Sequence, residues 1–270
     1  MNDVSDDGCF SRSENDYCNC AAATKLNRVW DNGEMCERFV QSHDAAFYAD
    51  AFQVETIRTE AMPASFNVAP TDQVYAVAEH DGERLLGAFR WGLVPFWAKD
   101  LKIGVRNINA RAETAAEKPA FRDSFLKRRC LIPADGFYEW QTLPKGKLPH
   151  YIYQADGRPL ALAGLWSNWK DPEAGEWVRS CTILTGAPNE LVDDIHDRMP
   201  VILPEEAWAD WLDRENHDQG YLESLLKTFP ANRMAEHAVS TLVNKVANNY
   251  AECIEPLETG ATGQPESADT

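Results

Sequence analysis

The sequence lacks any hydrophobic run long enough to cross a membrane, and its first residues lack the positive charge and apolar stretch of a secretory signal. These absences predict a soluble, cytoplasmic protein with no membrane partner. Cysteine is scarce. The chain has 7 cysteines, an odd number scattered along 270 residues, and this distribution does not indicate a disulfide framework. Cys9, Cys18 and Cys20 match no zinc-binding spacing, so we expect no metal site and no cofactor.

Positive charge is also in short supply. With 26 Lys and Arg against 43 Asp and Glu, the formal charge is −17 and the pI is near 4.7. This balance argues against general binding of polyanions, because nonspecific affinity for nucleic acids comes from basic side chains. An acidic surface is also typical of proteins from a salt-rich cytoplasm. Some basic residues could still line a local groove that binds DNA, or they could simply face solvent. These residues are Arg38, Arg90, Arg106, Arg111 and the run 127–129.

No internal repeat is present, and the two ends differ from the middle. Residues 1–35 and 258–270 are polar without helical or strand periodicity, so we interpret them as disordered segments flanking one domain at 36–257. Helices are expected from Ser42, from 190 to 195 after an Asn189 cap, and from 204 to 212. Strands are expected at 74–77, 84–91, 129–132, 136–140, 150–153, 160–165 and 180–185. This irregular mixture predicts an α+β fold.

Polar islands interrupt the apolar sequence at 36–39, 66–71, 107–114, 135–140 and 194–200. The first opens on Cys36, directly after Met35. If nothing preceded it, Cys36 would carry an amine and a thiol, whose reference pKa values of about 8 and 8.5 leave part of each unprotonated at neutral pH. Such a pair can close a thiazolidine ring on an aldehyde. The simpler alternative is a small buried residue beside an ordinary internal methionine.

Taken in order, these islands and the segment 91–97 resemble the SOS-response-associated peptidase (SRAP) family, the abasic-site processing proteins. The resemblance runs from Cys36 to about residue 256. It implies a central barrel-like, mainly antiparallel β arrangement flanked by helices. It also implies that a mature N-terminal cysteine forms a thiazolidine crosslink with the ring-opened sugar of an abasic site in single-stranded DNA. We therefore expect a monomeric DNA damage response protein that associates with the nucleoid on its substrate.

The resemblance assigns catalytic roles to Cys36, Asn109, Glu139 and His196. Cys36 would supply both nucleophilic atoms. Glu139, between Tyr138 and Trp140, would be partly desolvated, which raises a carboxyl pKa and suits proton transfer in both directions. His196 has carboxylate neighbours that could hold its imidazolium, and it would protonate the sugar oxygen. Asn109 would orient the cysteine or the aldehyde oxygen.

Further residues are expected to bind DNA or to support the catalytic groups. Arginine grips phosphate through a bidentate fork, and tryptophan stacks on unpaired bases. The candidates for DNA contact are Arg38, Asn67, Pro70, Trp97, Arg111 and Trp140, with Thr185 and Arg198 as supporting residues and Arg198 as a further phosphate candidate.

Two features depart from the family pattern. Glu37 stands where the family usually has glycine, and it adds negative charge beside the nucleophile. Residues 1–35 are an extension, and with them in place Cys36 has an amide nitrogen that cannot form a Schiff base. Translation could start at Met35, or residues 1–35 could be a propeptide removed by Cys36 itself. Crosslinking could be accompanied by strand incision if β-elimination occurs before the thiol closes the ring. The competing functions are an N-terminal-nucleophile peptidase or amidase acting on protein, and a noncatalytic DNA-binding scaffold.

Overall fold

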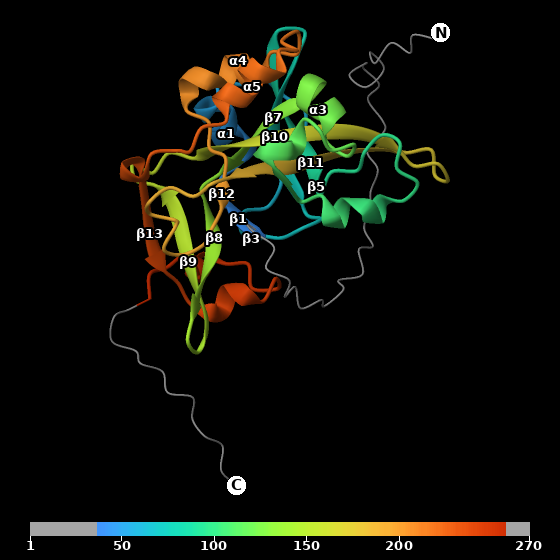
Figure 1. Ribbon diagram of the computed structural model, residues 1–270. Helices are drawn as coiled ribbons and strands as arrows, with labels where there is room; N and C mark the ends of the chain where they lie inside the picture. Colours follow the sequence, from blue (N-terminus) through green and yellow to red (C-terminus); the bar gives the residue numbers. More distant parts are fainter. Residues whose placement is uncertain (1–36, 258–270) are drawn as a thin grey trace, which may run out of the picture. The chain divides into compact units, whose positions relative to one another are not determined.

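The computed structural model describes residues 37–257, all within one compact unit (Figure 1). Cys36, the extension 1–35 and the tail 258–270 lie outside the described residues. The strands are β1 (Arg38–Gln41), β2 (Thr56–Ile57), β3 (Ser65–Val68), β4 (Gln73–His80), β5 (Glu83–Trp91), β6 (Asn109–Arg111), β7 (Arg129–Ala134), β8 (Gly136–Leu143), β9 (Gly146–Gln154), β10 (Leu160–Lys170), β11 (Trp177–Gly186), β12 (Met199–Pro200) and β13 (Met234–Ala238). The α-helices are α1 (Ala45–Ala51), α2 (Ala112–Ala115), α3 (Arg122–Lys127), α4 (Trp208–Leu212) and α5 (Gln219–Leu225). Short 3-10 helices are η2 (Leu101–Arg106), η3 (Glu205–Ala207), η4 (Ala231–Arg233), η5 (Thr241–Asn244) and η6 (Ala251–Cys253).

Five of the strands close into a barrel. Strands β11, β10, β7, β4 and β5 follow one another as antiparallel neighbours, and β5 then pairs with β11 in parallel. Because the ring is closed, each of the five strands is paired on both of its edges. Strand β6 pairs in parallel with β11. Asn109 is the first residue of β6. The expected barrel-like, mainly antiparallel arrangement is confirmed.

A second sheet lies beside the barrel, in the order β13-β9-β8-β1-β3. Hydrogen bonds join β1 to the barrel at the buried amide of Gln41. The Gln41 Nε2 donates to the carbonyl oxygens of Tyr75 at 3.0 Å and Pro133 at 2.7 Å, and its Oε1 accepts from the Tyr75 backbone N–H at 2.9 Å. This amide therefore takes the place of main-chain hydrogen bonds between the end of β1 and two barrel strands.

Apolar side chains fill the inside of the barrel and cover its outside. Phe89, Ile132, Leu162 and Ile183 belong to the inner cluster. Helices α1, α4 and α5 gather on one side of the barrel, at the top of Figure 1, where Phe52 stacks on Trp208 with ring centroids 4.8 Å apart. Burial of these rings supplies the main favourable term in folding.

All seven predicted strands are confirmed, and the structure extends most of them. The helix predictions need correction. Helix α1 is capped by Asp44, whose side chain accepts from the Phe47 N–H, while the backbone N–H and hydroxyl of Ser42 donate to Asp135 instead. Residues 190–195 form turns rather than a helix, although Asn189 Oδ1 does accept from two following N–H groups. The predicted segment 204–212 is a 3-10 turn followed by α4.

Candidate functional site

The first residue of β1, Arg38, is buried at 6% exposure. Its Nη1 donates to Asn67 Oδ1 at 3.0 Å and to the Val243 carbonyl at 3.1 Å. Burial lowers the pKa of this guanidinium, and the negative charges of Glu37 and Asp72 oppose that effect. The structure thus uses Arg38 to hold the start of β1 against β3 and η5. Its predicted contact with phosphate stays a prediction.

Asn67 is buried at 2% and completes this connection. Its Nδ2 donates to the carbonyls of Val243 at 3.1 Å, Lys245 at 3.1 Å and Asn248 at 2.8 Å. We call the group formed by Arg38, Asn67, Val243, Lys245 and Asn248 the β1 clamp. The amide predicted to shape a loop against the nucleotide is therefore turned inward, toward the protein.

Glu139 lies on β8, next to β1, and is buried at 2%. Phe137 and Glu139 share one face of β8 because side chains alternate along a strand, and Phe137 belongs to the main core cluster. Directly across from Glu139 on β9 is His150, whose Nδ1 lies 2.7 Å from Glu236 Oε2. Sequence reasoning missed His150. The turn at 144–145 sets this pairing, and the predicted strands at 136–140 and 150–153 did not fix where that turn lies.

Asn109 opens β6, and its position follows from two aromatic residues. The Trp91 Nε1 donates to the carbonyl of Ile108, the residue before Asn109, at 2.9 Å. Phe39 of β1 packs edge-on against the Trp91 ring, with centroids 4.9 Å apart. The start of β1 and the start of β6 are thereby neighbours through one indole.

His196 lies in the turn between β11 and β12, and its side chain is 21% exposed. Its backbone N–H donates to the Val192 carbonyl at 2.8 Å. The Gln141 Nε2 of β8 donates to the Asp194 carbonyl at 3.0 Å, which ties this turn to the strand that carries Glu139. The predicted residues Asn109, Glu139 and His196 thus come from three elements that are joined around β1.

Two different groups contact the Nδ1 atom of His196. The Arg198 backbone N–H donates to it at 3.3 Å, and Asp197 Oδ1 lies 3.2 Å from it. An N–H donor requires an unprotonated Nδ1, whereas a carboxylate favours a protonated one. The ring therefore has a partner at Nδ1 in its neutral and in its protonated state. Within residues 37–257, both polar contacts of the ring use Nδ1, and Nε2 is left for a substrate.

Arg198 is paired rather than free. Its Nη1 and Nη2 donate to Glu113 Oε1 at 2.9 Å and Oε2 at 2.8 Å, and Nη2 also donates to the Thr185 carbonyl at 2.6 Å. Thr185 is fully buried, and its hydroxyl donates to the Ala110 carbonyl at 3.4 Å. Thr185 and Arg198 therefore connect β6, β11 and the His196 turn. Glu113 was not among the residues predicted individually, although it lies inside the polar island 107–114.

The predicted DNA-contact residues divide by exposure. Trp97 is 49% exposed and Arg111 is exposed as well. Trp140 is half-buried, and its Nε1 donates to Asn244 Oδ1 of η5 at 2.7 Å. Pro70 is partly exposed and precedes Thr71, a β-branched residue with φ of 79°, a backbone conformation that such residues rarely adopt. Strain of this kind often marks functional loops.

The segment that carries Trp97 is fixed by its backbone. The Val94 N–H donates to the Ser180 hydroxyl at 2.8 Å, and the Asn107 side chain donates to the Leu93 carbonyl at 2.9 Å. Gly92 has φ of +122°, and a Cβ there would lie 2.6 Å from the Gly104 carbonyl oxygen. A rigid support therefore presents Trp97 to solvent.

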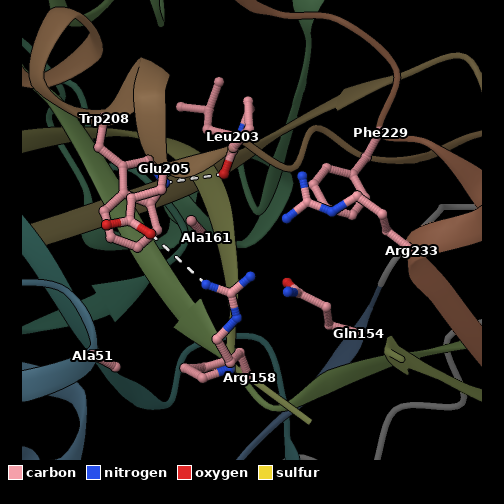
Figure 2. A pocket seen from close by; sticks show the side chains of 11 residues that line it. Ala51, Gln154, Arg158, Ala161, Leu203, Glu205, Trp208, Phe229 and Arg233 are labelled. Atoms are coloured by element: carbon pink, nitrogen blue, oxygen red, sulfur yellow. Dashed lines mark hydrogen bonds and ion pairs between the residues drawn. The ribbon is translucent and has the colours of Figure 1, made fainter. Parts of the chain in front are cut away.

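Figure 2 shows a cavity with a different lining. It is lined by Gln154, Arg158, Trp208 and Arg233, among others, and by none of the predicted site residues. Among the described residues, no group of three or more His, Cys, Asp and Glu side chains could hold a metal ion. Over the same residues, no helix is long and apolar enough to span a membrane.

Comparison with known proteins gives consistent relationships. A family model described as SOS response associated peptidase (SRAP) matches residues 35–246. The chain is 45% identical over 223 residues to the abasic site processing protein YoqW of Bacillus subtilis, across 82% of this chain and 99% of that protein. It is 34% identical over 230 residues to YedK of Escherichia coli, which bears the same description, across 83% and 100%. A solved structure from Bacteroides thetaiotaomicron matches with a TM-score of 0.74 at 27% identity, covering 82% of this chain and 99% of that one. The chain therefore belongs to the SRAP family.

Proposed function

We propose that this protein processes abasic sites in single-stranded DNA by forming a covalent thiazolidine crosslink through Cys36. The observation that carries the proposal is the 45% identity to a protein named for abasic site processing, along nearly the whole length of that relative. The arrangement of Asn109, Glu139 and His196 on elements joined around β1 supports it. Cys36 precedes Arg38, the first residue of β1, by two positions in the sequence.

The chemistry uses both nucleophiles of an N-terminal cysteine. The amine adds to the C1′ aldehyde of the ring-opened sugar and gives a carbinolamine, which loses water to form an imine. The thiol sulfur then adds to the imine carbon while the nitrogen takes up a proton, which closes the five-membered ring. One water is released overall, and no oxidant or metal is required. One residue thus supplies both covalent bonds.

The neighbouring side chains would move the protons. Glu139 would accept a proton from the amine as general base and return one to the departing hydroxyl as general acid. The His196 imidazolium would donate its Nε2 proton to the sugar oxygen as the ring opens, and Asp197 would hold the proton that remains at Nδ1. Asn109 would orient the aldehyde oxygen. If the imine persists before the thiol adds, β-elimination would cut the strand, which is the proposed lyase activity.

Removal of residues 1–35 is part of the proposal, because an amide nitrogen at Cys36 cannot form an imine. The family match beginning at residue 35 supports translation from Met35 followed by methionine excision. The alternative is self-cleavage, in which the Cys36 thiolate attacks the Met35 carbonyl and the Met35–Cys36 amide bond breaks, leaving a thioester and a free Cys36 amine. Water then hydrolyses the thioester, which releases residues 1–35 with a carboxylate at Met35 and restores the Cys36 thiol. The word peptidase in the family description fits the second route. The intact mass of the natively expressed protein shows whether residues 1–35 are present. Because both routes end at Cys36, detection of the released peptide 1–35 is what would identify self-cleavage.

The exposed residues of the site would bind the strand around the lesion. Trp97 would stack on a flanking base, and Arg111 would contact a phosphate. Such contacts are compatible with a formal charge of −17 because few phosphates would be neutralised.

The test uses protein that begins at Cys36 and an oligonucleotide with one abasic site. We expect a crosslinked band that survives denaturation, and a Cys36→Ser variant that forms only a borohydride-reducible imine with more strand cleavage. The full chain, confirmed by intact mass to retain residues 1–35 and so to have a blocked Cys36 nitrogen, is the matched control and should give no band. A folded mature protein that forms no crosslink would refute the proposal. Cleavage of peptide substrates without crosslinking would favour an N-terminal-nucleophile peptidase instead.

A further inference from the structure

Glu113 lies on α2, outside the set of residues expected to react, and yet it makes the most specific ion pair near His196. Both of its carboxylate oxygens accept from Arg198, at 2.9 and 2.8 Å. This bidentate geometry fixes the guanidinium plane as well as its distance. The two residues are 85 positions apart in the sequence, so the pair adds a direct side-chain link between α2 and the His196 turn, both of which already lie next to β11.

Arg198 passes this constraint on to His196. Its Nη2 also donates to the Thr185 carbonyl at 2.6 Å, so the side chain is held from two sides. The backbone N–H of the same residue donates to His196 Nδ1 at 3.3 Å. A hydrogen bond at one ring nitrogen sets the tautomer and orientation of an imidazole. In the neutral ring, this contact favours the proton on Nε2, whereas Asp197, whose side chain is 89% exposed and screened by water, becomes the partner of Nδ1 once a second proton gives the imidazolium.

We propose that Glu113 is a positioning residue for His196, acting through Arg198. The proposal rests on the proposed function only for its kinetic consequence; the structural consequence can be measured without DNA. It also gives Arg198 a use other than phosphate binding, since its charge is already matched by a carboxylate. The exposed Arg111, in the same polar island 107–114, is still the residue proposed to contact a phosphate.

The charges around Glu113 favour the ionised carboxylate that this role needs. The hydrogen bond from Arg198 lowers the pKa of Glu113, burial opposes this effect, and Arg111 adds a smaller lowering. The side chain is 53% exposed, so replacing it does not open a cavity in the core. Glu113→Gln keeps the size of the side chain and removes its charge. Glu117→Gln removes an equal charge from an exposed position in the same segment and is the matched control.

The first experiment measures the His196 tautomer by ¹⁵N NMR in the full chain without DNA, with the resonance assigned through its loss in His196→Ala. We expect a neutral Nε2–H ring in the wild type and in Glu117→Gln. Glu113→Gln and Arg198→Lys should both shift the ring toward a mixture of tautomers, because each disrupts the bidentate pair. A Glu113→Gln spectrum identical to that of the wild type at His196 would overturn the proposal. Thermal melting confirms that each variant is folded.

The second experiment measures crosslinking rates with protein that begins at Cys36, which retains the compact unit containing all described residues. Glu113→Gln should slow crosslinking about fivefold in the wild-type background and leave the rate unchanged in a His196→Ala background, since coupled residues are not additive. Equal slowing in both backgrounds would contradict action through His196. Tighter DNA binding by Glu113→Gln with an unchanged tautomer would instead assign Arg198 to a phosphate. If no protein forms a crosslink, the proposed function fails while the tautomer measurement still decides the role of Glu113.

Discussion

Replacement of Asn67 by alanine tests whether the β1 clamp holds the site together from inside the protein. The Asn67 side chain accepts from Arg38 Nη1 and donates to three carbonyls. A net contribution of about 1 kcal/mol for each bond to a carbonyl, with about 2 kcal/mol for the bond from the charged guanidinium, gives a total near 5 kcal/mol. Because the amide has only two N–H groups for three carbonyls, one bond is shared, and we expect a loss of about 4 kcal/mol.

The free energy of unfolding is measured by urea titration and by thermal melting. A loss of about 4 kcal/mol corresponds to a decrease in Tm of about 10 °C for a domain of this size. The matched control is Asn249→Ala. Asn249 is exposed, and its Oδ1 accepts from the Phe66 backbone N–H at 2.6 Å and from the Ser65 hydroxyl at 3.4 Å, so its loss should cost about 1 kcal/mol. Equal losses for the two variants would refute the assignment of a buried structural role to Asn67.

Three further predictions concern stability and the reaction. Arg129→Lys should lower the free energy of unfolding by about 3 kcal/mol in a urea titration, because the buried Arg129 guanidinium donates to the carbonyls of Phe125, Leu126, Trp211, Asp213 and Asn216 and an ammonium cannot reach all of them. Glu139→Gln should slow the crosslinking rate about tenfold or more in a single-turnover assay, and an unchanged rate would remove Glu139 from proton transfer. Trp97→Ala should weaken binding of single-stranded DNA by about 1–3 kcal/mol in fluorescence anisotropy, whereas unaltered affinity would mean that no base stacks on the exposed ring.

Much of the fold followed from the sequence because strand signals are local. The strand at 160–165 alternates little and is continuously apolar, as expected when both faces are buried between the barrel interior and the covering helices. The strands β1 and β6 were not predicted, since four-residue and three-residue segments show no period and exist only through their partners. The predicted helix at 190–195 was wrong. The Asn189 side chain does accept from the N–H groups of the next residues, as a helix cap would, but residues 190–195 form turns and no helix follows.

The sequence could suggest candidate residues for the site, but not the contacts that join them. Asn109 and His196 were predicted from the order of the polar islands and the family resemblance, and their roles stay predictions. The pairing of Arg198 with Glu113 depends on side chains 85 residues apart and leaves no local pattern. The inward orientation of Asn67 likewise depends on η5 near the other end of the domain. A polar residue in a motif can bind a ligand or the protein itself, and the sequence does not distinguish the two.

The hydrogen bond from Arg38 to the Val243 carbonyl has a consequence for synthesis of the chain, because it spans 205 residues. Contacts between residues so far apart in sequence form late in folding, after the entropy of closing the loop has been overcome. A chain emerging from the ribosome exposes β1 long before η5 is translated. The segment that follows Cys36 therefore completes its packing only when almost the whole domain has been made, so that a nascent chain carries the proposed nucleophile without the side chains proposed to assist it.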